Sequence, residues 1–97
     1  MPKAYTITFY RSISNPAALA EYAKLAGPAI QAAGGRFLAR GGTAKTYEAG
    51  INQRVVVIEY DSVEKAVAAY ESAAYQAAAS LIKGTVERDV RIVESVT

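Results

Sequence analysis

Residues 34–42 read Gly34-Gly35-Arg36-Phe37-Leu38-Ala39-Arg40-Gly41-Gly42, a strand-like run between two pairs of glycines. Side chains alternate across a β-strand, so Arg36, Leu38 and Arg40 are expected on one face and the two residues between them on the other. The stretch therefore predicts a strand over residues 36–40 in which two guanidinium groups point the same way. Its glycines provide the turns at both ends.

Three further segments predict strands. Residues 5–10 alternate and are rich in β-branched and aromatic residues, and residues 89–96 alternate as well. Residues 54–60 have a continuous apolar centre, which favours burial on both faces of that strand. Residues 44–48 are predicted to form a short edge extension, followed by a loop.

Two helical regions separate these strands. Asn15-Pro16 is typical of an N-cap followed by proline at the first helical position, and a helical stripe of apolar residues follows. Gly27-Pro28 predicts a kink or break in this helix, because proline removes a backbone hydrogen bond. Asp61-Ser62 is predicted to cap the second helical region, and Ser72 to start a new helix over residues 73–83.

The order strand, helix, strand, strand, helix, strand predicts a ferredoxin-like βαββαβ fold of the α+β class over residues 1–97 as a single domain. Its four-stranded antiparallel sheet would carry the helices on one face. Residues 5–10 and 54–60 have apolar or aromatic residues on both faces, so the uncovered face also needs a partner. We expect a homodimer through the open sheet face, which makes a dimeric α/β barrel.

The composition excludes several classes of chemistry. The 97 residues include no cysteine and no histidine, so acid–base chemistry must use carboxylates, tyrosines, lysines or water. We expect no metal site and no cofactor, haem included. The net charge of +2 with scattered basic residues argues against nucleic acid, and no apolar run approaches a membrane span. With no signal peptide, a cytoplasmic location is the expectation.

The chain resembles the domain of unknown function 1330 family (DUF1330). Three segments carry the resemblance: residues 34–42, residues 54–60 with Ser62 after them, and residues 70–76, where Tyr70, Ser72, Tyr75 and Gln76 match. The resemblance implies membership of the dimeric α/β-barrel superfamily, which includes cofactor-independent monooxygenases, muconolactone isomerase-like enzymes and haem-degrading enzymes. Sharing a barrel does not transfer any of these activities.

The chain also departs from the family pattern at three positions. Ile82 stands where family members often have an arginine, Ala73 where they often have a proline, and Tyr70 where they often have a tryptophan. If that arginine contacts a ligand in relatives, this chain lacks the contact.

Two residues are candidates for catalysis. Glu59 ends an apolar strand, so it could be a proton acceptor with a raised pKa or the partner of an arginine. Tyr75 lies on a helix face expected to contact the sheet, so its phenol could donate to a substrate carbonyl or enolate, or simply belong to the core.

The candidate ligand-binding residues are six: Phe9, Arg36, Arg40, Tyr70, Ser72 and Gln76. Arg36 and Arg40 could hold an anionic ligand such as a carboxylate, or form a polar rim or an intersubunit salt bridge. Ser72 is expected to be a helix cap and Gln76, one turn later, to point into the same cleft or into solvent. A pocket between sheet and helices would be lined by Phe9, Arg40, Glu59, Tyr70 and Tyr75.

Two functions are compatible with these residues. The first is a cofactor-independent enzyme that carries out proton transfer or oxygenation on a small carbonyl or aromatic compound. The alternative is a non-catalytic small-molecule-binding or structural dimer. RNA binding, which ferredoxin-like sheets often support, is disfavoured because the aromatic and basic pattern of RNA-binding strands is missing.

Overall fold

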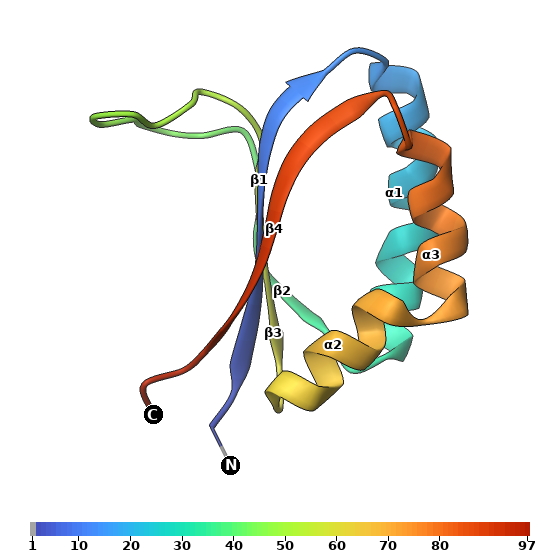
Figure 1. Ribbon diagram of the computed structural model, residues 1–97, viewed down its shortest axis with the longest axis vertical. Helices are drawn as coiled ribbons and strands as arrows, with labels where there is room; N and C mark the ends of the chain where they lie inside the picture. Colours follow the sequence, from blue (N-terminus) through green and yellow to red (C-terminus); the bar gives the residue numbers. More distant parts are fainter. Residues whose placement is uncertain (1) are drawn as a thin grey trace.

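The computed structural model describes residues 2–97 as a four-stranded sheet with all its helices on one side (Figure 1). The elements are β1 (Ala4–Ile13), α1 (Pro16–Ala32), β2 (Arg36–Gly41), β3 (Val55–Tyr60), α2 (Val63–Glu71), α3 (Ala73–Ala79), the 3-10 helix η1 (Ser80–Ile82) and β4 (Val86–Glu94). The strand order is β2-β3-β1-β4, and every neighbouring pair is antiparallel. The predicted ferredoxin-like α+β fold is confirmed.

One predicted strand is absent. Residues 44–48, expected as an edge extension, belong to an irregular loop over residues 42–54 that projects from the sheet on the side opposite the helices (Figure 1). The Thr43 hydroxyl donates to the carbonyl of Gln53 and joins the two ends of this loop at 2.5 Å. Among residues 2–97, no helix combines the length and apolar character needed to cross a membrane.

Helix α1 runs through Pro28, so of the kink or break predicted there, the break is wrong. The helix begins at Asn15, whose side chain accepts a hydrogen bond from the amide of Ala18 at 3.1 Å. Proline in a helix interior costs about 3 kcal/mol through the lost hydrogen bond and the clash with the preceding turn. Ala26 and Ile30 are both buried, one on each side of Pro28 in sequence, and their packing against the sheet keeps the helix in register.

The predicted helix restart at Ser72 is confirmed. The Ser72 hydroxyl accepts from the amide of Tyr75 at 3.2 Å and donates to the carbonyl of Ala69 at 2.8 Å, so it closes α2 and opens α3. This junction holds the rings of Tyr70 and Tyr75 with their centroids 5.2 Å apart.

A β-bulge in β2 overturns the expectation that Arg36 and Arg40 share a face. Arg36 lies opposite Glu59, and Arg40 lies opposite Val56, but the register shifts between them and leaves Leu38 without a partner. An extra residue on one strand reverses the facing of every side chain beyond it. Arg36 therefore lies on the open face of the sheet, whereas Arg40 lies on the helix side.

The two faces of the sheet differ in burial. On the helix side, alternate residues of β1 and β3 are almost fully covered by the helices: Ala4, Thr6, Thr8, Tyr10, Val56, Ile58 and Tyr60. On the open face, Phe9 is 41% exposed and Val93 is 48% exposed. This uncovered apolar surface agrees with the expectation that the face meets a partner.

Candidate functional site

Arg88 is surrounded by three tyrosines in the space between the sheet and the helices. Its Nη1 donates to the hydroxyl of Tyr22 at 3.3 Å and to that of Tyr10 at 3.5 Å, and its Nη2 donates to the hydroxyl of Tyr75 at 3.0 Å. The hydroxyls of Tyr22 and Tyr75 are themselves hydrogen-bonded at 2.6 Å. We call these four residues the Arg88 cluster.

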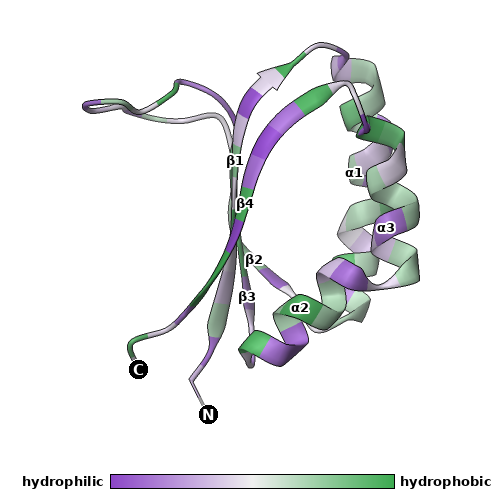
Figure 2. Ribbon diagram, in the orientation of Figure 1, coloured by the Kyte–Doolittle hydropathy of each residue, from purple (hydrophilic) through white to green (hydrophobic). Residues whose placement is uncertain are grey.

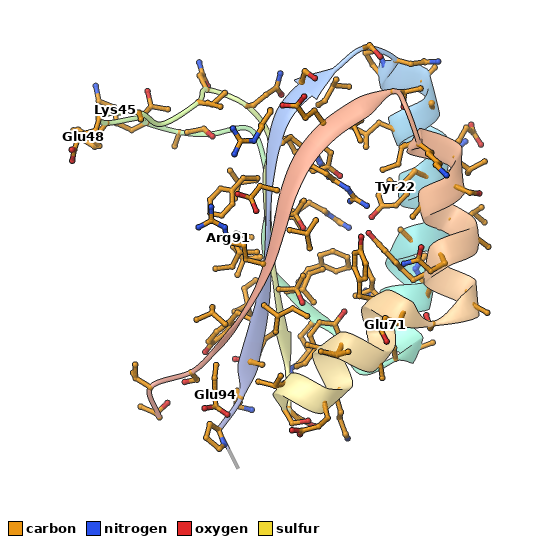
Figure 3. All side chains as sticks on the ribbon, in the orientation of Figure 1. Tyr22, Lys45, Glu48, Glu71, Arg91 and Glu94 are labelled. Atoms are coloured by element: carbon orange, nitrogen blue, oxygen red, sulfur yellow. The ribbon has the colours of Figure 1, made fainter. Side chains whose placement is uncertain are left out.

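Four elements bring the cluster together. Arg88 of β4 and Tyr10 of β1 are paired in the sheet, so their side chains leave the same face side by side. Tyr22 comes from α1 and Tyr75 from α3, and their rings meet edge to face with centroids 6.0 Å apart. Figure 3 shows Tyr22 pointing from its helix into the space in front of the sheet. The cluster thus joins both helical segments to an edge strand.

The cluster carries the positive charge of Arg88, and no counter-ion lies against it among residues 2–97. Its three tyrosines are buried, and no carboxylate of residues 2–97 forms a salt bridge with Arg88. Burial alone lowers the pKa of Arg88, but the oxygens of Tyr75 and Tyr22 outweigh this effect and the net direction is upward. Burial, reinforced by Tyr75, raises the pKa of Tyr22 far above its ordinary value of 10.0. At neutral pH the cluster therefore holds a guanidinium cation and protonated Tyr22, and it supplies hydrogen-bond donors rather than a base.

A second arginine adds to this positive charge. Arg54 faces the helix side next to Tyr10, whose amide donates to the Arg54 carbonyl at 3.0 Å, and its Nε is buried with no hydrogen-bond partner among residues 2–97. Arg54 and Arg88 flank β1 from opposite sides, so their strands are roughly 10 Å apart. The like charges of the two guanidinium groups repel each other. A bound anion would offset this repulsion.

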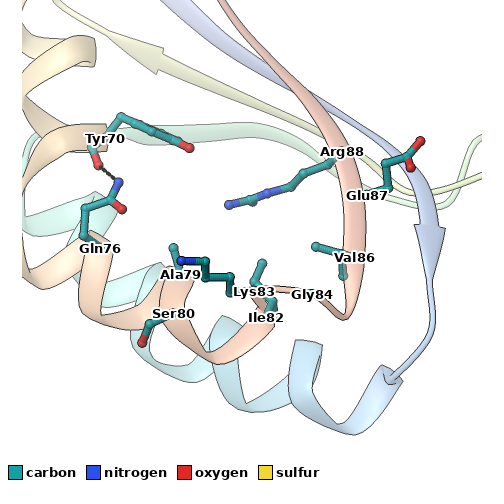
Figure 4. Close-up of a pocket in the computed structure, with 10 residues that line it drawn as sticks. All are labelled: Tyr70, Gln76, Ala79, Ser80, Ile82, Lys83, Gly84, Val86, Glu87 and Arg88. Atoms are coloured by element: carbon teal, nitrogen blue, oxygen red, sulfur yellow. Dashed lines mark hydrogen bonds between the residues drawn. The ribbon is translucent and has the colours of Figure 1, made fainter.

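The Arg88 cluster borders a pocket of about 580 Å³ between the helical layer and β4 (Figure 4). The pocket is lined by Tyr70, Gln76, Ala79, Ser80, Ile82, Lys83, Gly84, Val86, Glu87 and Arg88. In Figure 4, the side chains of Tyr70 and Arg88 point toward each other across the pocket, whereas the Glu87 carboxylate points away from both. The pocket therefore offers a half-buried guanidinium facing an aromatic ring.

Two of the candidate residues line this pocket, and two others hold them in position. Tyr70 and Gln76 line it directly, and the Gln76 amide donates to the Tyr70 carbonyl at 2.6 Å across the helix junction. Tyr75 is buried beneath Tyr70 and reaches the pocket through Arg88. Ser72 acts as the helix cap that sets the spacing of these residues.

Phe9, Arg36 and Glu59 lie on the opposite face of the sheet, so the expectation that Phe9 and Glu59 line a helix-side pocket is wrong. Each follows the alternation of its strand away from the buried neighbours. Glu59 accepts from Arg36 Nε at 3.0 Å, and Arg36 also binds Asp61 at 2.9 Å, which lowers the pKa of Asp61. Arg36 and Glu59 thus form the structural ion pair that the sequence left open as an alternative.

Arg40 lies on the helix side but away from the main pocket. Its guanidinium is stacked on the ring of Phe37, with Cζ 4.3 Å from the ring centroid. With Arg54 and Tyr22 it borders a small cavity of about 30 Å³, large enough for about one water molecule. Arg40 therefore contributes positive charge near the Arg88 cluster without lining the pocket.

The sequence contained a pattern that could have revealed Arg88. Alternation through Val86, Arg88, Val90 and Ile92 places a charged residue within an otherwise apolar face. Because the predicted strand begins at Asp89, it does not include Arg88, and the alternation was not recognised. In Figure 2 the upper part of β4, facing α3, appears as a hydrophilic band on the ribbon.

Among residues 2–97 no group of three or more carboxylates, histidines or cysteines is placed to hold a metal ion.

Comparison with known proteins agrees with this architecture. The model of the family described as Domain of unknown function (DUF1330) matches residues 3–96, nearly the whole chain. No curated protein matches the chain.

Three solved structures share the fold. The RPA0582 protein of unknown function from Rhodopseudomonas palustris has 17% identity and a TM-score of 0.74, with 99% of this chain and 84% of that chain covered. SnoaB, a cofactor-independent oxygenase from Streptomyces nogalater, has 8% identity and a TM-score of 0.67, with 100% and 96% covered. A dimeric ferredoxin-like protein of unknown function from Thermobifida fusca has 16% identity and a TM-score of 0.57, with 97% and 92% covered.

Proposed function

The chain belongs to the DUF1330 family, and we propose that it is a cofactor-independent enzyme acting on a small carbonyl or aromatic compound bound in the pocket beside Arg88. The observation that carries the proposal is a guanidinium at the border of a pocket, held by three tyrosines and with no salt-bridge partner in the described part of the chain, residues 2–97. Such fixed donors stabilise negative charge that develops on a substrate oxygen.

The chemistry proposed is proton transfer or oxygenation. Water would accept a proton lost from the carbon beside a carbonyl, or from a phenol, and Arg88 would stabilise the negative charge left on the substrate oxygen. In the oxygenation case the carbanion would form a carbon–oxygen bond with dioxygen, which is the oxidant, and the peroxide would take a proton back from water. Loss of water from this hydroperoxide would break its O–O bond and leave a new carbonyl group. SnoaB, described as a cofactor-independent oxygenase, has the same fold, and this analogy of fold supports the oxygenation proposal.

One observation favours the alternative of a non-catalytic binding protein. The Arg88 cluster contains no carboxylate, and the pKa of Tyr22 is raised, so the cluster itself offers no proton acceptor at neutral pH. Glu59, the expected base, is engaged by Arg36 on the other face. Under this alternative the pocket binds the same class of compound without turnover.

Turnover assays separate the two candidates. Small carbonyl and aromatic compounds that bind the pocket are incubated with the protein in D₂O for proton exchange, and in an oxygen electrode for oxygen uptake. Arg88→Gln is expected to lower kcat/KM about 10²-fold or more, as loss of an oxyanion donor does, whereas Arg91→Gln on the open face of the sheet is expected to change it little. Binding without proton exchange or oxygen uptake would contradict the enzymatic proposal and favour the alternative.

We also propose that the protein forms a homodimer through the open sheet face. Ile7 and Val57 are paired at the centre of this face, and Phe9 and Val93 leave apolar surface uncovered nearby. Val57→Glu would place a charge in that surface and is expected to give a folded monomer by light scattering. A wild-type protein that is monomeric at micromolar concentration would contradict the dimer. The cytoplasmic location stays a prediction from sequence.

A further inference from the structure

We infer that the ligand of the pocket carries a carboxylate, which is bound side-on by the free edge of the Arg88 guanidinium through two parallel N–H···O bonds. This inference rests on the proposed function, because it names the ligand class of the same pocket.

The hydrogen bonds of Arg88 leave one edge of the guanidinium unused. Arginine has five N–H donors in a planar fork. Two N–H groups of Nη1 serve Tyr22 and Tyr10, and one of Nη2 serves Tyr75. No hydrogen bond within residues 2–97 uses the Nε–H or the second N–H of Nη2. The side-on pair formed by Nε and Nη2 is the geometry that matches the two oxygens of a carboxylate.

The tyrosines fix this edge in place. The hydroxyls of Tyr22 and Tyr75, 2.6 Å apart, accept from Nη1 and Nη2 respectively and together occupy the end of the fork. The guanidinium also lies near the faces of two rings, with Cζ 5.4 Å from the centroid of Tyr22 and 5.8 Å from that of Tyr10. A guanidinium held on three sides loses little freedom when it binds a ligand on the fourth.

Charge favours a monoanion over a neutral compound. Arg88 and Lys83 line the pocket with Glu87, which leaves one net positive charge in the lining. Arg54, behind Tyr10, has no salt-bridge partner among residues 2–97 and adds to the potential. A neutral carbonyl could accept the same hydrogen bonds but would leave this charge uncompensated.

The rest of the ligand should be apolar and compact. The pocket is far larger than a carboxylate, and the ring of Tyr70 faces Arg88 from the opposite wall (Figure 4). Ala79, Ile82 and Val86 supply apolar lining. A small aromatic acid would place its ring near Tyr70 while its carboxylate meets Arg88, and benzoate is therefore the probe.

The test compares benzoate with benzamide, a neutral compound of nearly the same shape, at constant ionic strength. Both are titrated into the full-length protein and followed by ¹⁵N NMR, including the side-chain Nε–H of Arg88. We expect benzoate to shift that resonance together with the amides of residues 79–88, and to bind at least about tenfold more tightly than benzamide. Arg88→Lys, which keeps the charge but loses the fork, should weaken benzoate at least about tenfold. Arg91→Lys, the same change on the open face of the sheet, should change benzoate affinity by less than about threefold.

Three results would overturn the inference: equal affinity for benzoate and benzamide, benzoate binding that Arg88→Lys leaves unchanged, or no benzoate shift at tens of millimolar. The comparison of two probes on the wild-type protein does not depend on whether any variant folds. Failure of the two proposals can be told apart. If neutral compounds bind the pocket and are turned over, with no preference for acids, only the carboxylate inference is overturned. If benzoate binds as described but no acid is turned over, the carboxylate inference is supported and the enzymatic proposal is contradicted.

Discussion

Replacing Tyr75 by phenylalanine removes a single oxygen from the Arg88 cluster and tests whether the cluster holds the helices to the sheet. That oxygen takes part in two hydrogen bonds, at 2.6 Å with Tyr22 and at 3.0 Å from Arg88. A neutral bond contributes about 1 kcal/mol and one to a charged group about 1.5–3 kcal/mol. The two hydrogen bonds share one oxygen, and water from the pocket can replace the bond to Arg88. We therefore expect Tyr75→Phe to lower the free energy of unfolding by about 2 kcal/mol.

The assay is urea unfolding followed by circular dichroism at a fixed protein concentration, since a dimer makes stability depend on concentration. Tyr70→Phe is the matched control, because Tyr70 lies next to Tyr75 but its hydroxyl makes no hydrogen bond within residues 2–97. It should change the free energy of unfolding by less than about 0.5 kcal/mol. Equal stabilities of the two variants would refute the reasoning, because the buried hydroxyl pair would then contribute nothing.

Three further predictions concern other parts of the chain. Burial raises the pKa of Tyr60 to about 12, so above pH 10, where the unfolded phenol ionises first, the free energy of unfolding should fall by up to about 1.4 kcal/mol per pH unit for this group. Urea unfolding between pH 9 and about pH 11 checks this. Tyr60→Phe should reduce the fall of the free energy of unfolding with pH, and an unchanged fall would contradict the raised pKa of Tyr60. Gly35→Ala should destabilise the fold by about 1–3 kcal/mol, because its Cβ would come within 2.5 Å of Ile30 Cγ2, while Gly42→Ala meets nothing within 4 Å and should be near neutral in the same assay. Arg36→Met breaks an exposed ion pair and should change the free energy of unfolding little while leaving benzoate affinity unchanged in the NMR titration; a large loss of affinity would return Arg36 to the binding site.

The architecture was predictable because local patterns and packing agree along most of the chain. Ser72 illustrates this, since a serine between two helical stripes can satisfy the amide of Tyr75 only by interrupting the helix there. Pro28 shows the opposite case. Its local penalty was read correctly, but burial of Ala26 and Ile30 on the same helix outweighs it.

The candidate site was predictable only in part, because it depends on strand register. A single bulged residue, Leu38, moves Arg36 and Arg40 to opposite faces, and alternation alone cannot reveal an inserted residue. Arg88 was missed because its strand begins three residues earlier than predicted. Tyr75 was identified as a candidate, but its partners Tyr22 and Arg88 are distant in sequence and meet only through the fold.

A crystal structure of the protein soaked with a mixture of small aromatic and carbonyl compounds tests most directly whether the helix-side pocket is the functional site. We expect a bound compound between Arg88 and Tyr70, with the Tyr22–Tyr75 hydroxyl pair intact behind it. Compounds bound only on the open face of the sheet near Phe9 and Arg91, or a pocket closed by its own side chains, would contradict the claim that the helix-side pocket is the functional site.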